Sequence, residues 1–136
     1  IALIISHPKA NSASIYYGGI LLLAVGISHA LTSSLFPMDP VGAKSTLPGK
    51  LHLVLVGISV LAIFIMMPLI GIGFKELYGS DAFQVYTFVS LGIILVSGLS
   101  SPIVIAKKIE VMGLTERITG YTFYIWLGVL SLSLPN

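Results

Sequence analysis

Four long apolar runs constrain this chain more than any other feature of its sequence. They cover residues 15–36, 51–74, 83–106 and 115–134. A helix rising about 1.5 Å per residue needs about 20 residues to cross the ~30 Å of hydrocarbon in a bilayer. Membrane barrel strands alternate apolar and polar residues, whereas these runs are continuously apolar. The sequence therefore predicts an all-α, polytopic transmembrane helix bundle with four full spans.

The composition points to a membrane as well. Hydrophobic residues make up 56% of the 136 residues and charged residues 9%, with a mean hydropathy of +1.03. Because a soluble domain carries roughly a quarter charged residues, we expect one membrane domain over residues 1–136. The longest basic run is Lys107-Lys108, which excludes nucleic acid as a partner. The expected partners are the lipid bilayer and other membrane subunits or further copies of the chain.

The first residues are apolar before any expected span begins. Residues 1–6 contain only one polar residue, and His7-Pro8 then interrupts them. A signal peptide would need a basic start and a cleavage site, neither of which this segment has. We expect residues 1–6 to be the end of a preceding helix, and the chain to be N-terminally incomplete.

The loop charges predict an orientation. If four spans alternate, two basic residues fall on one side of the membrane, and five fall on the other: Lys44, Lys50, Lys107, Lys108 and Arg117. Cytoplasmic loops carry an excess of Lys and Arg. We therefore expect the loops holding Asp39 and His52 and residues 107–117 to be cytoplasmic, in the cytoplasmic membrane of a prokaryote.

Small residues recur inside the spans, among them Gly18, Gly26, Gly57 and Gly73. Lipid tails give helices no hydrophobic reason to associate, so close backbone approach at small residues is how membrane helices pack. These glycines are predicted to lie at helix–helix contacts.

The candidate site lies where the first two spans meet. The segment LFPMDP carries Asp39, and GKLHL opens the next span with His52. Asp39 is able to cap the following turn, and His52 to bond a neighbouring carbonyl. In the functional interpretation, Asp39 orients an imidazole that moves a proton or holds a headgroup oxygen. On the predicted topology Glu116 and Arg117 share this side, which gives a structural or ligand-binding cluster of Asp39, His52, Glu116 and Arg117.

His29 raises the question of a cofactor. It lies about seven residues before Phe36, roughly 10 Å below the interface by helical rise. A haem ligated by His29 and His52 would need both at one depth, and they differ by about 8 Å. Hydrogen bonding of His29 to Ser28, Ser33 or a carbonyl of another helix is favoured instead. We therefore predict no metal and no cofactor, with haem as the disfavoured alternative.

Several of these segments together resemble a known family. LFPMDP after a glycine-containing span, GKLH opening the next, and GLTER before a Trp-bearing last span are similar to the bacterial and archaeal domain of unknown function 998 membrane family. The resemblance runs from about Gly19 to Trp126. It implies a bundle of about six spans, and it implies no particular activity, substrate or cofactor. The residues that it emphasises are Phe36, Pro37, Asp39, His52, Gly113, Glu116 and Arg117.

Two classes of function follow. The first is a non-enzymatic accessory or structural subunit, or a binder of lipid or another small hydrophobic ligand. The alternative is a carrier of a small molecule, protons or electrons that uses Asp39, His52 and His29. Proton relays usually bury several charged groups, and charges are scarce inside these spans. The first class is therefore favoured, with no catalytic residues and no enzyme activity expected.

Overall fold

The computed structural model describes residues 12–39, 43–106 and 112–134, and of residues 99–106, 112, 113, 115 and 116 it describes the backbone alone. The described residues form helices and no strand: α2 (Ala13–Leu35), α3 (Leu47–Tyr78), α4 (Asp81–Ala106) and α5 (Met112–Ser133). The chain divides into two compact units, Ile1–Gly73 and Phe74–Asn136, with the boundary inside α3. The expected helix end at residues 1–6 lies outside the described residues.

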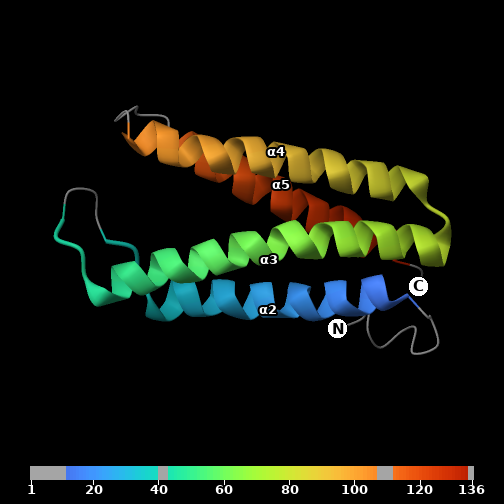
Figure 1. The fold of residues 1–136 in the computed structure, drawn as a ribbon, viewed down its shortest axis with the longest axis horizontal. Helices are drawn as coiled ribbons and strands as arrows, with labels where there is room; N and C mark the ends of the chain where they lie inside the picture. The colour runs from blue at the N-terminus through green and yellow to red at the C-terminus, as the bar shows by residue number, and fades with distance from the viewer. Residues whose placement is uncertain (1–11, 40–42, 107–111, 135–136) are drawn as a thin grey trace. The chain divides into compact units, whose positions relative to one another are not determined.

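In the first unit, α2 and α3 form an antiparallel pair (Figure 1). The Ser12 hydroxyl accepts the Ile15 N–H at 3.2 Å and so caps the start of α2. The helix ends at the C-cap Phe36 because Pro37 follows, and a residue before proline is biased away from helical geometry. Contacts along the pair keep one register, each step forward on α2 matching a step backward on α3: Ile15 with Gly73, Ser28 with Ser59, and Phe36 with His52.

Two of the predicted glycine contacts are confirmed in this unit. A Cβ added to Gly18 would lie 2.7 Å from Ile70 Cγ1, and one added to Gly73 would lie 2.6 Å from the Ile15 backbone nitrogen. At Gly26 and Gly57 the same atom would meet nothing within 4 Å. Glycine therefore permits close approach at two positions, and the other two face away from the α2–α3 contact.

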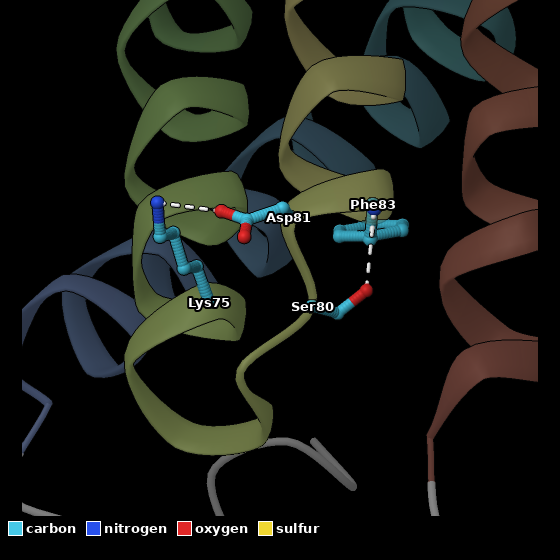
Figure 2. Close-up of polar contacts among 4 residues, drawn as sticks. All are labelled: Lys75, Ser80, Asp81 and Phe83. Carbon is cyan, nitrogen blue, oxygen red and sulfur yellow. Dashed lines mark hydrogen bonds and ion pairs between the residues drawn. The ribbon is translucent and has the colours of Figure 1, made fainter.

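The second unit begins with the last turn of α3 and a tight connection to α4 (Figure 2). Gly79 has φ +66°, a left-handed conformation that suits glycine, and its N–H bonds the Lys75 carbonyl at 2.8 Å. The Ser80 hydroxyl accepts the Phe83 N–H at 3.3 Å and caps α4. Lys75 Nζ and Asp81 Oδ1 are 2.6 Å apart. Because both side chains are largely exposed, this pair contributes less than about 1 kcal/mol.

Hydrogen bonds between side chains join α4 and α5, which run antiparallel. The Trp126 Nε1–H donates to the Thr87 hydroxyl oxygen at 2.9 Å, and Thr87 donates to the Phe83 carbonyl at 2.8 Å. Ser97 and Thr119 share a hydroxyl hydrogen bond of 2.7 Å farther along the pair. Thr87 and Trp126 are both fully buried, so the indole is anchored inside the unit.

Aromatic rings surround that anchor. Phe123 stacks on Trp126 with centroids 6.1 Å apart and an interplanar angle of 17°. Phe83 lies 6.3 Å from Trp126 and 4.4 Å from Phe74, which stands in the last turns of α3. Such pairs contribute about 0.5–1.5 kcal/mol each beyond the area that they bury.

The all-helical fold is confirmed. Three helices are long and apolar enough to cross a membrane: Ala13–Leu35, Leu47–Tyr78 and Asp81–Gly98. The fourth predicted span corresponds to α5 and stays a prediction. α3 is longer than the expected span of residues 51–74. An apolar run stops at the first charged side chain, whereas the helix itself continues to its caps. Lys50 and Lys75 therefore lie inside α3.

Candidate functional site

Asp39 lies between α2 and α3 and braces the start of α3. Thr46 donates its backbone N–H to Asp39 Oδ2 at 2.8 Å and its hydroxyl to Asp39 Oδ1 at 2.6 Å. The same hydroxyl oxygen accepts the Gly49 N–H at 3.2 Å, which makes Thr46 the N-cap of α3. A carboxylate is also favoured at a helix N-terminus by the helix dipole. Asp39 thus holds the residue that caps the helix.

Gly49 makes room for this arrangement. It is buried, and a Cβ built on it would overlap the Asp39 carboxylate. A side chain at position 49 would therefore push Asp39 away from Thr46. The glycine of the GKLHL segment is explained by this close approach.

The hydrogen bonds from Thr46 lower the pKa of Asp39 below its ordinary value of 3.8, the hydroxyl contributing most and the backbone N–H next, against a small opposing effect of burial. The carboxylate is consequently ionised at neutral pH. A general acid or base works best with a pKa near the operating pH, so this environment moves Asp39 away from proton transfer.

His52 contacts the C-terminal end of α2, the other helix at this junction. Its Nδ1 lies 2.8 Å from the carbonyl oxygen of Phe36, the C-cap of α2. Because a carbonyl oxygen only accepts, the contact assigns the ring proton to Nδ1. The last carbonyls of a helix have no partner within it, and the Nδ1–H of His52 supplies one to the Phe36 carbonyl. His52, which is half-buried, therefore acts as a cap for α2.

His29 lies on the exposed side of α2. The hydroxyls expected to bond its ring are engaged elsewhere: Ser28 with Ser59 at 2.7 Å, and Ser33 with the backbone carbonyl of His29 at 2.6 Å. That expectation is wrong for these two hydroxyls. The contact of His52 with Phe36 is seven residues farther along α2, about 10 Å from His29 by helical rise. Haem ligation by the two histidines, and the absence of a cofactor, stay predictions.

Glu116 and Arg117 belong to the second unit and Asp39 and His52 to the first. Arg117 is exposed near the start of α5, while the Glu116 side chain and residues 107–111 lie outside what the structure describes. The four-residue cluster and the cytoplasmic placement of both loops therefore stay predictions.

Sequence reasoning missed several residues that hold the helices together. Thr46 had a signal, because a threonine directly before Leu47-Pro48 is a typical helix start. The cross-helix bonds of Ser59 and Thr87 had none, since a hydroxyl in an apolar run does not indicate which helix faces it.

Comparison with curated proteins and with solved structures finds no match. A match to a protein family covers residues 1–133, nearly the whole chain, and the family is described as protein of unknown function (DUF998). Three helices of membrane-spanning length and composition agree with an integral membrane protein. The chain therefore belongs to the DUF998 family, as its LFPMDP, GKLH and GLTER segments had suggested.

Proposed function

We propose that this protein is a non-enzymatic structural or accessory component of a membrane, in which Asp39 and His52 are reciprocal helix caps. One observation carries the proposal: the acid is bonded at the N-terminus of α3 and the imidazole at the C-terminus of α2. The carboxylate is at the helix end where the dipole favours negative charge, and the Nδ1–H donor is at the end whose carbonyls lack partners within the helix. Together the two caps close the connection of an antiparallel helix pair.

The same bonds argue against an acid–histidine pair that moves protons. In such a pair the carboxylate accepts the Nδ1 proton, which orients the ring and stabilises its charged form. Here Nδ1 bonds the Phe36 carbonyl, and both oxygens of Asp39 bond Thr46. The carboxylate and the imidazole would have to bond each other to move a proton, and each bonds a backbone or hydroxyl group instead.

His52→Leu, with His29→Leu as its matched control, tests this role. Both substitutions remove an imidazole, and only His52 bonds a helix end. Loss of one net hydrogen bond should lower the unfolding free energy of the His52 variant by about 0.5–1.5 kcal/mol in detergent. The His29 variant should stay within about 0.5 kcal/mol of the parent. Proton flux in proteoliposomes should be equal in all three proteins. Abolished flux in the His52 variant with unchanged stability would overturn the proposal.

We also propose that α5 is the fourth span, in a prokaryotic cytoplasmic membrane with the α2–α3 connection facing the cytoplasm. Its 22 residues would extend about 33 Å, enough to cross the hydrocarbon. The chain has no cysteine, so single cysteines report sidedness without background. An impermeant thiol reagent applied to intact cells should label Ser80→Cys and Leu134→Cys and spare Lys44→Cys. If Lys44→Cys and Leu134→Cys behave alike, both labelled or both spared, the fourth span is refuted.

A further inference from the structure

A proline interrupts the backbone hydrogen bonding of α3. Pro68 lies inside the helix, and it has no N–H to donate to the carbonyl four residues earlier, that of Phe64. A helix bends most easily where such a bond is missing. Met66 and Met67 directly precede the proline, and both are fully buried. Methionine side chains adapt to irregular spaces, so the residues beside this weak point tolerate a change of helix shape.

The turn of α3 that follows the proline packs closely against α2. A Cβ added to Gly18 would lie 2.7 Å from Ile70 Cγ1, and one added to Gly73 would lie 2.6 Å from the Ile15 backbone nitrogen. Small residues let two helix backbones approach in this way, and van der Waals packing is a main source of attraction between membrane helices. This turn is therefore held firmly on α2.

The part of the pair nearer the α2–α3 connection is packed differently. Among the described residues from 26 to 62, those that are buried are Thr32, Gly49 and Ser59, and none of them has a large apolar side chain. On α3 the apolar side chains of this stretch are turned outward, and Leu53 is 61% exposed. A region with few buried apolar contacts opens at a low cost in free energy. This end of the pair is consequently the end that opens most easily.

Hydrogen bonds join the two helices at this end. The Ser59 hydroxyl donates to the Ser28 hydroxyl at 2.7 Å, and His52 Nδ1 donates to the Phe36 carbonyl at 2.8 Å. Hydrogen bonds between membrane helices contribute little, because separated helices find other partners for the same groups. Both bonds are therefore able to break while α2 and α3 stay helical.

We propose that residues 47–67 of α3 form a hinged arm that swings about Pro68, away from α2, while the turn after the proline stays in place. In the closed state the bonds of Ser59 and His52 are made, as in this structure. In the open state both bonds are broken and the inner face of α2 around Ser28 is uncovered. This inference goes beyond the capping role of the connection, and it concerns the first unit alone.

Pairs of spin labels test the two ends of the helix pair separately, because the chain has no cysteine and a label can be placed at chosen exposed positions. Ser34→Cys with Val54→Cys reports the end near the connection, and Tyr17→Cys with Ile72→Cys reports the other end. Val54 is about 21 Å along α3 from Pro68, so a bend of about 20° moves it by about 7 Å. Double electron–electron resonance in lipid vesicles should give two distances for the first pair, about 7 Å apart, and one for the second.

Variants of the two prolines in α3 assign the movement to its pivot. Pro68→Ala restores the missing N–H and should leave the first label pair with the closed distance alone. Pro48→Ala is the matched control: Pro48 lies in the first turn of α3, where an N–H has no partner within the helix, so both distances should remain. Ser59→Ala should raise the ratio of open to closed arms about threefold, the equivalent of one hydrogen bond between membrane helices.

Circular dichroism verifies that each labelled variant is helical. A single distance for the first pair in the parent chain would overturn the proposal, and so would two distances that persist in Pro68→Ala. Two distances at both ends would also refute it, because α2 would then separate from α3 along its whole length instead of at the arm.

Discussion

The bond between Trp126 and Thr87 allows a quantitative test of how α4 and α5 are held together. The indole N–H donates to the Thr87 hydroxyl oxygen at 2.9 Å, and both residues have 0% of their surface exposed. Trp126→Phe removes the donor, and Thr87→Val removes the acceptor while preserving the shape of the side chain. The double variant removes both ends of the bond.

The three variants differ in what they leave behind. Trp126→Phe loses a net hydrogen bond of about 0.5–1.5 kcal/mol, and the missing ring atoms cost about 2 kcal/mol more. Thr87→Val leaves a buried indole N–H without its acceptor, which costs about 1–3 kcal/mol. In the double variant no orphaned donor remains, so its loss should be smaller than the sum of the single losses. The difference, the coupling energy, should be about 0.6–1.5 kcal/mol.

Reversible unfolding in mixed micelles, followed by circular dichroism, gives each free energy without relying on the tryptophan that two of the variants lack. Trp126→Phe combined with Ser97→Ala provides the control cycle. Ser97 lies ten residues from Thr87, about 15 Å along α4, where effects should add within about 0.5 kcal/mol. If the Trp126–Thr87 cycle is additive to the same degree, the bond does not contribute as the structure requires.

Further predictions concern the first unit. Cysteines in place of Ser28 and Ser59 should form a disulfide on oxidation, seen as a gel shift, because the hydroxyl oxygens that they replace are 2.7 Å apart; Ser28→Cys with Gly57→Cys should not. Asp39, whose pKa is lowered below 3.8, stabilises the fold above that pH, and this contribution is lost as pH falls through the lowered pKa. Asp39→Asn should therefore lower the melting temperature at pH 7 and weaken its dependence on pH in that acidic range. Gly73→Val should cost about 1–3 kcal/mol because its Cβ would lie 2.6 Å from the backbone of α2, whereas Gly57→Val should be nearly neutral.

The sequence was sufficient for the helices because their signal is spread over many residues. A run of more than twenty apolar residues predicts a membrane helix whatever its neighbours are. The ends were less predictable, since they depend on single caps. Thr46 caps the start of α3 and Gly79 follows its last residue, and hydropathy indicates neither position. The apolar signal of α5 is the weakest of the four because Arg117 and several hydroxyl-bearing residues interrupt its apolar run.

The candidate site could likewise be predicted only in part. Asp39 and His52 could be located from sequence because charged and ionisable residues are rare between apolar runs. Their partners could not be inferred. The acceptor for His52 is a backbone carbonyl, which every residue has, and its choice of Phe36 depends on where α2 ends and how α3 is turned. Sequence therefore identified the position of the polar groups, and geometry was needed to distinguish caps from a reacting pair.

Hydroxyl contacts across the helix pairs have a further consequence for register. Ser28 bonds Ser59 within the first unit, and Ser97 bonds Thr119 within the second. Such bonds in membranes contribute only about 0.6 kcal/mol on average, too little to hold a helix pair by themselves. Sliding one helix by a turn would separate the hydroxyls, and in the first unit it would also move Ile15 away from Gly73 and His52 away from Phe36. Ser59→Ala should consequently change the unfolding free energy little, and cysteines on α2 and α3 should still cross-link in a single register.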